Sequence, residues 1–425
     1  MELKEIYEAE ESGRFNKTLT VYCNAKDSSI RLRIKGIFNL IYMKNKQNVL
    51  LLMSFEMCVL FFCGCVGTTH APQNSYGLPV DSLIVEEHTI SFHDEWLGLQ
   101  SYSCTAHWKT DSVDYIVGYN HFEHALDCFD VTNGGMVRSI PLHREGADGV
   151  VDKICSMFPF SDDSIWVYDH VHFYLLDSDG EVHQKVAWNE YDSVIIEANH
   201  AMHTAQFVYN QMSASLLFPI RKNDRFYIYE WSLETEEVIN EHLLLPSVYN
   251  LKGDKKFANM DAPNVKFLND KVVYNYPYES TIYTLDLKTG EQLMYGGASQ
   301  YTANVADECS DWNDYSKWQR HGISNTHFYD VMYMPDLNLY VRLHLGGVDI
   351  DTNKSLSELG DSRVLYLMLF DHEFNIVGEY KLKEKTYNYF TGWCTLSNGL
   401  LIFKDNALSE LTDYDGSQFD IYRVH

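Results

Sequence analysis

The sequence predicts an all-β protein, a β-propeller of six blades, with seven blades as the alternative. Three observations lead to this prediction. Aromatic residues make up 14% of the chain, with 30 Tyr and 22 Phe, and such flat side chains favour half-buried strands. A four-strand unit recurs after position 80 at a spacing of about 50–60 residues, somewhat long for a four-stranded blade. The two ends of this region each supply part of one further unit, which allows a closed ring.

The most regular part of the unit is a Tyr- and Leu-rich third strand that ends near an Asp and turns, usually at a Gly, into a fourth strand. Gly supplies the positive φ of a tight hairpin, and an Asp before the turn can accept backbone N–H bonds. Copies of this pattern occupy residues 125–137, 173–182, 226–236, 282–292 and 365–375. A preceding strand accompanies each copy, at residues 115–119, 164–168, 215–218, 271–274 and 339–343.

The sixth unit is divided between the two ends of the domain. Three strands are expected near the C-terminus, at Trp393–Leu396, Gly399–Phe403 and Phe419–Val424. The missing strand is expected from Leu83–Glu86 and His88–Phe92. Pairing the N-terminal with the C-terminal strand closes the ring and leaves few free edges. An open β-sandwich array is the alternative arrangement.

A secretory signal precedes the propeller. Within residues 43–65, two lysines are followed by the apolar run Val49–Phe62, and the run ends in a lipobox-like Cys-Gly-Cys whose last residue is Cys65. We therefore predict that Cys65 is lipidated and anchors the mature chain to a membrane. An uncleaved membrane anchor is the alternative, but it needs about 20 apolar residues, and Glu56 interrupts this run.

This signal defines the expected domain organisation. Residues 1–42 are predicted to precede the true start at Met43 or to form a disordered extension, because a signal peptide should begin a chain. Residues 66–80 are expected to be a linker, and residues 81–425 the propeller. The predicted location is the bacterial cell envelope, as an outer-membrane lipoprotein, with the periplasmic or surface face left open.

The charge excludes one class of partner. The formal net charge is −27, and residues 66–425 alone carry −29, so nucleic acid phosphates would be repelled. The nine cysteines form no Cys-x-x-Cys pair, which argues against a zinc or redox motif. The sequence has no Gly-x-Ser-x-Gly, Walker or His-Glu-x-x-His motif, so we predict no catalytic residues and no cofactor.

Two histidine pairs have the side chains that could serve as metal ligands. His121 and His124 lie in one expected loop, and His200 and His203 lie in another. A metal would need a third or fourth ligand, and scattered loop histidines are common in a chain with 18 of them. We therefore predict no metal site.

The segment 301–324 is the best candidate for ligand binding. It is long, lacks strand alternation and lies between two units, as binding loops often do. Exposed aromatic side chains there could stack on sugar rings or anchor a protein partner. The alternative is a short helix that caps the ring. The candidate binding residues are Trp312, Tyr315, Trp318, Arg320 and His321 of this segment, together with Arg342. Arg342 is expected either to point into the central funnel or to form a structural salt bridge.

Five segments in a fixed order cover about residues 80–405: Glu145–Val150, Asp163–Tyr168, Leu175–Val182, Phe267–Tyr274 and Asn338–Arg342. Together they resemble a family of bacterial lipoproteins called domain of unknown function 4221, which is allied to six-bladed propellers. The resemblance implies a propeller fold and export. It supplies no catalytic residues.

Together these observations predict an envelope-anchored, non-catalytic propeller that binds a glycan, a peptide or a protein partner through its loops. One alternative is a glycan hydrolase or lyase with a cluster of carboxylates and histidine in the central funnel. The other is a structural subunit of an envelope assembly.

Overall fold

The computed structural model describes residues 13–22, 29–38, 71–80 and most of 82–424. Within the last range the description omits residues 92–101, 103, 111–112, 132–134, 147–148, 162, 189–192, 199–203, 269, 310–312, 389–391 and 410–415. The chain divides into two compact units, Met1–Gly67 and Thr68–His425. In the first, β1 (Gly13–Tyr22) pairs antiparallel with β2 (Ser29–Phe38), inside the predicted N-terminal extension. The signal segment and Cys65 lie outside the described residues.

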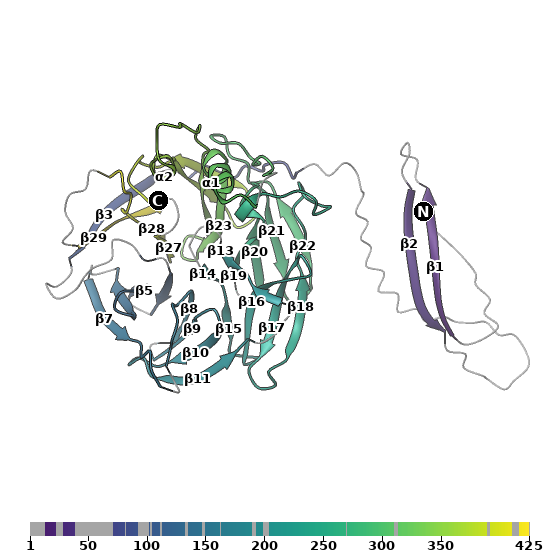
Figure 1. Cartoon of the computed structure of the whole chain (residues 1–425), viewed down its shortest axis with the longest axis horizontal. Helices are drawn as coiled ribbons and strands as arrows, with labels where there is room; N and C mark the ends of the chain where they lie inside the picture. Colours follow the sequence, from purple (N-terminus) through teal and green to yellow (C-terminus); the bar gives the residue numbers. More distant parts are fainter. Residues whose placement is uncertain are drawn as a thin grey trace, which may run out of the picture. The chain divides into compact units, whose positions relative to one another are not determined.

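The second unit is a propeller of six antiparallel blades, as predicted (Figure 1). Blade 1 contains β4 (Thr105–Lys109), β5 (Asp114–Asn120), β6 (Ala125–Asp130) and β7 (Gly135–Pro141). Blade 2 contains β8 (Ser156–Ser161), β9 (Ser164–Tyr168), β10 (His172–Leu176) and β11 (Val182–Ala187). Blade 4 contains β19 (Asn264–Leu268), β20 (Lys271–Asn275), β21 (Ile282–Asp286) and β22 (Gln292–Tyr295). Blade 5 contains β23 (His327–Met334), β24 (Leu339–Leu345), β25 (Leu365–Phe370) and β26 (Ile376–Lys381).

Blade 3 departs from the simple pattern because its inner strand is interrupted. Its long strands are β16 (Ser215–Lys222), β17 (Arg225–Ser232) and β18 (Val238–Leu243). Two short strands, β12 (Ser193–Ile195) and β15 (Val208–Asn210), pair with different parts of β16. Between them, β13 (Glu197–Ala198) and β14 (Thr204–Ala205) pair with each other.

Blade 6 closes the ring with strands from both ends of the domain. It contains β27 (Trp393–Leu396), β28 (Gly399–Phe403), β29 (Gly416–Val424) and, outermost, β3 (Leu83–Ser91). The register runs from Leu83 opposite Val424 to Ser91 opposite Gly416. The closure by terminal strands is therefore confirmed, with one continuous strand where two short segments were expected.

The repeated turns have the chemistry that the sequence indicated. Oδ1 of Asp177, Asp286 and Asp371 each accepts two backbone N–H bonds from its own turn, at 2.8–3.0 Å. Gly180 and Gly290 have φ of 86° and 73°. Since an Asp side chain holds the turn in place, the third and fourth strands of a blade pair in a fixed register.

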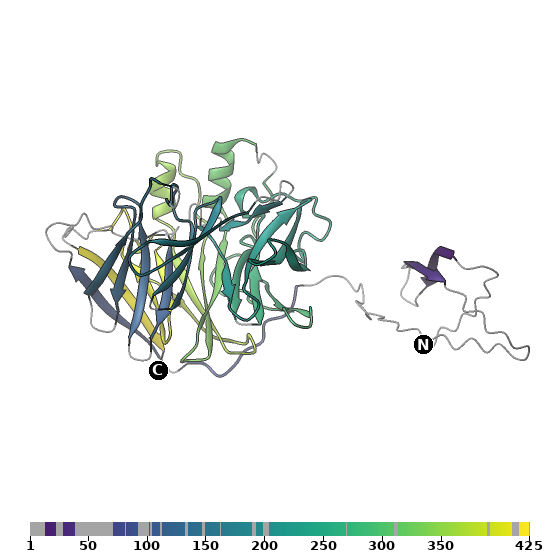
Figure 2. The same ribbon diagram turned by 90° about the horizontal axis from the view of Figure 1, so that it is seen from below.

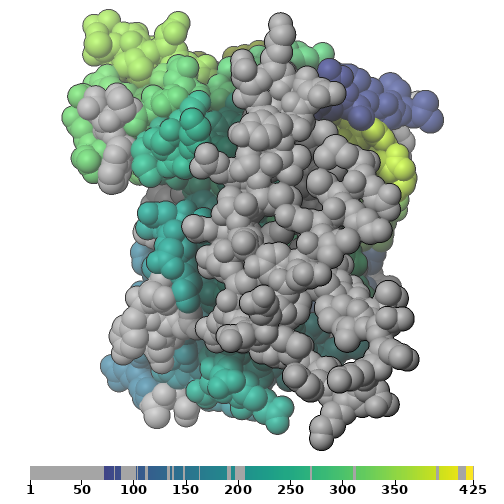
Figure 3. All heavy atoms as spheres, turned by 90° about the vertical axis from the view of Figure 1, so that its right-hand side faces the viewer, coloured from purple at the N-terminus to yellow at the C-terminus, as the bar shows by residue number. Residues whose placement is uncertain are grey.

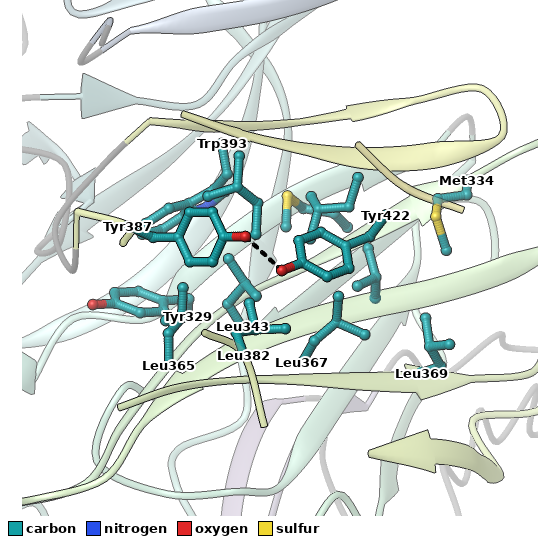
Figure 4. Packing of buried hydrophobic residues seen from close by; sticks show 14 of the residues in the cluster. Tyr329, Met334, Leu343, Leu365, Leu367, Leu369, Leu382, Tyr387, Trp393 and Tyr422 are labelled. Carbon is teal, nitrogen blue, oxygen red and sulfur yellow. Dashed lines mark hydrogen bonds between the residues drawn. The ribbon is translucent and has the colours of Figure 1, made fainter. Parts of the chain in front are cut away.

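The core consists of apolar clusters between neighbouring blades. Figure 4 shows the cluster between blades 5 and 6, where Leu343 and Leu367 pack beside Tyr387 and Tyr422, whose hydroxyls are 2.6 Å apart. Another cluster joins Phe129 of blade 1 to blade 6. The core therefore runs around the ring, because each blade buries its two faces against its two neighbours.

The segment 71–80, expected to be a linker, runs along the outer edge of blade 5. The Ile376 N–H donates to Ser75 O at 2.7 Å, and the Gly77 N–H donates to Ile376 O at 3.0 Å. This contact covers the edge strand β26, which would otherwise present unpaired backbone groups.

Both helices lie on one face of the propeller (Figure 2). α1 (Tyr315–Ser324) follows the last strand of blade 4, and α2 (Leu356–Asp361) joins β24 to β25. Because strands alternate in direction, the β16–β17 turn and the β18–β19 connection, with its short 3-10 helix η1 (Ala258–Met260), lie on this same face. We call it the helical face. Neither helix in the described part of the chain is long and apolar enough to cross a membrane.

Candidate functional site

A cavity of about 480 Å³ opens on the helical face between blades 3 and 4. Four stretches of chain line it: the β16–β17 turn, the end of β18, the β18–β19 connection, and the residues that follow β20. In the space-filling view, teal atoms from this part of the sequence lie next to the green atoms that follow blade 4 (Figure 3). The lining residues are Arg221, Asp224, Arg225, Phe226, Leu243, Leu244, Pro246, Ser247, Asn250, Leu251, Lys252, Gly253, Lys255, Lys256, Asp261, Tyr276 and Tyr278.

The connection that forms one wall is held by its own side chains. Asn250 Nδ2 donates to Lys255 O at 3.0 Å, and the Lys255 N–H donates to Asn250 Oδ1 at 3.1 Å. Between them, Gly253 adopts a φ of 69°, which a residue with a side chain rarely adopts. The Phe257 N–H donates to Asp261 Oδ1 at 3.1 Å. These bonds keep the wall in one conformation without a ligand.

The deep side of the cavity is aromatic. Tyr276 and Tyr278 are almost fully buried, and the Tyr276 hydroxyl donates to Leu245 O at 2.8 Å. The Tyr278 ring stacks on Phe257 with centroids 3.7 Å apart and planes 7° apart. The cavity therefore has a preformed floor, which reduces the entropy lost when a ligand binds.

Positive charge is concentrated around this cavity. Five of its lining residues are Arg or Lys, and two are acidic, in a chain with a net charge of −27. Lys255 pairs with Glu308 at 3.2 Å. The remaining cations are mostly exposed and form no ion pair within the described part of the chain; they are Arg221, Arg225, Lys252 and Lys256. Burial raises the pKa of the nearby Asp261 carboxyl.

The predicted binding segment 301–324 is largely helical where it is described. Asp314 caps α1 by accepting the N–H groups of Ser316 and Lys317, which agrees with the alternative of a short helix. Tyr315 is exposed, and its ring lies 5.1 Å from that of the half-buried Trp318. Trp312 lies outside the described residues.

The other two candidates in this segment point in different directions. Arg320 is exposed at the helix surface. His321 is buried and its Nε2 lies 2.6 Å from Asp307 O, so it fixes the helix to the preceding loop. Neither residue, nor Tyr315 or Trp318, lines the cavity.

The segment nevertheless borders the cavity through other residues. The Cys309 N–H donates to Lys256 O at 2.7 Å, and Glu308 holds Lys255. α1 also contacts η1. The predicted segment thus supports the cavity wall from behind.

Arg342 lies apart from the other candidates and is closed to solvent. Its Nη1 donates to Ser280 O at 2.8 Å and its Nη2 to Gly297 O at 2.5 Å. The guanidinium also lies 4.7 Å from the centre of the Phe328 ring. No ion pair of Arg342 occurs among the described residues, so carbonyl oxygens take the place of the expected salt bridge. Its role in the structure is to tie blade 5 to the loops of blade 4.

A Ser-His-Glu cluster near Arg342 has the composition of a hydrolytic triad but a different geometry. His344 Nε2 lies 3.1 Å from Ser299 Oγ and 3.3 Å from Glu379 Oε1, and Ser299 Oγ donates to the same Glu379 oxygen at 2.5 Å. In a triad, the two imidazole nitrogens separate the serine from the carboxylate. Here one nitrogen contacts both, and Nδ1 has no partner among the described residues. Burial also lowers the pKa of His344, which is fully enclosed.

Glu279 is a second buried acid, and it lies behind the cavity wall. It is fully inaccessible, and the Tyr283 hydroxyl donates to its Oε1 at 2.7 Å. Its Oε2 has no hydrogen-bond partner in the described structure. Burial raises the pKa of Glu279 to about 7, although hydrogen bonds from neighbouring hydroxyls lower it in part.

The histidine pairs differ in their surroundings. His124 is buried, with Nδ1 2.8 Å from the Tyr119 hydroxyl and Nε2 2.7 Å from Val150 O. The His121 ring lies 4.0 Å from the Phe122 ring at an interplanar angle of 34°, and His200 and His203 lie outside the described residues. Within the described ranges, no group of three or more His, Cys, Asp or Glu side chains could hold a metal ion.

Sequence reasoning missed the cavity, although a signal was present. Residues 221–225 read Arg-Lys-Asn-Asp-Arg and residues 252–256 read Lys-Gly-Asp-Lys-Lys, two basic clusters in an acidic chain. Each cluster alone resembles a solvated turn. Only the neighbouring positions of blades 3 and 4 bring them to one site.

Comparison with known proteins agrees with the fold. The structure is similar to a DUF4221 family member from Bacteroides vulgatus, with a TM-score of 0.65 and 14% identity over 83% of this chain and 99% of that chain. It is also similar to a Bacteroides fragilis protein whose name assigns it provisionally to the exported proteins, with a TM-score of 0.50 and 11% identity over 83% and 99% of the two chains. No curated protein matches the chain. The family model of DUF4221, a domain of unknown function, matches residues 81–381, and this protein therefore belongs to the DUF4221 family.

Proposed function

We propose that this protein is a non-catalytic binding propeller of the bacterial cell envelope, and that it binds a small ligand such as a short glycan or peptide in the cavity between blades 3 and 4. The cavity itself is the observation that carries the proposal. Its volume of about 480 Å³ lies within the range of about 300–1,000 Å³ that is usual for small-molecule sites. It lies on the face where the loops of two blades converge and has an ordered floor.

Two features of the chain favour binding over catalysis. Of the two acids that line the cavity, Asp224 and Asp261, Asp261 already accepts a backbone N–H, so its carboxylate supports the wall. The Ser299, His344 and Glu379 cluster is buried and lacks the relay geometry of a triad. A hydrolase would need a pair of carboxyl groups facing an open cleft.

The envelope location rests on the sequence and on the related proteins. The lipobox-like end of residues 43–65 supports lipidation at Cys65, and with it an outer-membrane anchor. The name of the Bacteroides fragilis relative supports export. Lipidation is tested by mass spectrometry of the protein from membranes, where a diacylated Cys65 at the mature N-terminus is expected.

Ligand binding is tested by thermal shift and calorimetry on the folded chain with a panel of disaccharides and short peptides. A ligand that binds only the native state raises the melting temperature. Leu251→Trp fills the cavity mouth and is expected to abolish binding. Ile239→Trp is the matched control, because Leu251 and Ile239 are similarly exposed but only Leu251 lines the cavity. Equal binding by both variants, or turnover of a bound glycan, would contradict the proposal.

A further inference from the structure

We infer that the cavity between blades 3 and 4 selects an acidic sugar, a short oligosaccharide that carries carboxylate or sulfate groups, and rejects its neutral counterpart. This inference rests on the proposed function, since it assumes that a small ligand enters the cavity. It adds the charge and the chemical class of that ligand.

The first observation is that cations from separate stretches of chain meet at one place. Arg221 and Arg225 flank the β16–β17 turn of blade 3, whereas Lys252 and Lys256 belong to the connection that leads to blade 4. More than twenty residues separate the two groups in sequence. The fold therefore assembles the positive charge from two blades.

The second observation is that these cations form no ion pair within the described residues, although acids are abundant and Arg221 and Lys256 lie near enough to Asp261 to act on its carboxyl. Elsewhere in the described structure, exposed lysines do pair: Lys109 with Asp336 at 2.7 Å, and Lys381 with Glu384 at 2.6 Å. At the cavity only Lys255 has such a partner. In a chain of net charge −27, unpaired cations gathered around a cavity leave a local positive field for an anion.

The two residue types offer complementary contacts. A guanidinium presents a planar pair of N–H groups that matches the two oxygens of a carboxylate or sulfate, whereas an ammonium acts as a point charge. Arg221 and Arg225 would receive the oxyanion, and Lys252 and Lys256 would neutralise a second one. A ligand with two negative groups a short distance apart would use both sides.

The apolar lining residues indicate the chemistry of the uncharged part of the ligand. Phe226, Leu243, Pro246 and Leu251 give an apolar wall beside the charges. Apolar and aromatic walls pack against the C–H faces of sugar rings. A bare inorganic anion would leave this wall unused. A nucleic acid is disfavoured because the protein surface as a whole is strongly negative.

The experiment varies ligand charge on a disaccharide body. Calorimetry on the folded chain compares lactose, the unsulfated chondroitin disaccharide with one carboxylate, and the 6-sulfated form with a carboxylate and a sulfate. We expect affinity to rise about tenfold with each negative group at low salt, a difference of about 1.4 kcal/mol per step. The gain should shrink between about 50 mM and about 300 mM NaCl, since salt screens exposed charges.

A pair of double variants localises the effect. Arg221→Glu with Lys256→Glu reverses two cavity charges and should weaken the sulfated disaccharide by at least about a hundredfold. Lys354→Glu with Lys383→Glu changes the net charge equally at exposed sites outside the cavity and should change affinity less than about threefold.

The outcomes separate the two proposals. If lactose binds as tightly as the sulfated disaccharide and Leu251→Trp abolishes both, the cavity is a binding site but the charge inference is wrong. If inorganic sulfate binds as tightly as the sulfated disaccharide, the sugar part of the inference is wrong. If none of these probes binds, both this inference and the proposed glycan ligand are contradicted.

Discussion

Replacing Glu279 by Gln should stabilise the protein at alkaline pH and remove a pH dependence that the wild type has. Glu279 lies in blade 4 between β20 and β21, with no exposed surface. Its Oε1 accepts the Tyr283 hydroxyl, and its Oε2 has no hydrogen-bond partner within the described residues. A carboxylate in this position loses its hydration without full replacement, so the protonated form is favoured.

The magnitude follows from the pKa. The folded protein holds the pKa of Glu279 at about 7, compared with 4.5 for the ordinary group. Because the folded-state pKa is raised, the folded state binds the proton more tightly than the unfolded state does. Stability is therefore greatest below pH 4.5 and falls as the pH rises toward 7. The total loss is about 3 kcal/mol above pH 7, of which about 2.5 kcal/mol falls between about pH 5 and pH 8.5.

The assay is thermal unfolding of wild type and Glu279→Gln at a series of pH values. For a unit the size of Thr68–His425, about 2.1 cal/mol/K per residue gives an unfolding entropy near ~0.75 kcal/mol/K. The variant should therefore melt about 4 °C above wild type at pH 8.5 and within about 1 °C at pH 5. Glu234→Gln, at an exposed turn, is the control. A variant that melts lower than wild type at pH 8.5 would refute the reasoning.

Three further predictions test the fold. Arg342→Lys cannot satisfy both carbonyl oxygens and should lower stability by about 2–3 kcal/mol, measured as a fall in melting temperature of about 3–4 °C; an unchanged value would contradict the bridging role. A protein that begins at residue 71 should melt like the full propeller, whereas deletion through Ser91 removes β3 and should abolish the single cooperative transition, as followed by calorimetry. Gly180→Ala should lower the free energy of unfolding by about 2–4 kcal/mol, measured with denaturant, because its positive φ is strained in alanine and its Cβ would meet a backbone carbonyl. Gly290→Ala is the control, since Gly290 has a similar φ in open space, and should lower it by about 1 kcal/mol. Equal losses would show that crowding at Gly180 is unimportant.

The propeller could be predicted because its signals are local. An Asp such as Asp286 and a Gly such as Gly290 mark a turn within a few residues, and alternation marks the strands on either side. The terminal strands were recognisable because the C-terminal unit lacked a fourth strand and the N-terminal end of the domain contained an additional one. The interrupted inner strand of blade 3 was missed, since β12 and β15 are only three residues each.

The cavity could not be predicted for the opposite reason. Its charges come from two turns whose proximity depends on how blades 3 and 4 pack, which a single sequence does not display. Arg342 illustrates the same limit: strand alternation places it on a face, but the carbonyl oxygens of Ser280 and Gly297 that hold it belong to another blade. The aromatic residues of α1 were visible in sequence, yet Glu308 and Cys309 make the contacts to the cavity wall.

The pairing of β3 with β29 has a consequence for biosynthesis. Leu83 is synthesised well before its partner Val424, which lies 341 positions later in the sequence. Joining positions so distant costs about 5 kcal/mol in loop-closure entropy, and the ladder can form only after β29 has been synthesised. The nascent chain must therefore keep an unpaired, aggregation-prone strand apart from its neighbours until β29 has been made. A chain that stops before β29 lacks that strand of blade 6 and also leaves β3 without its partner.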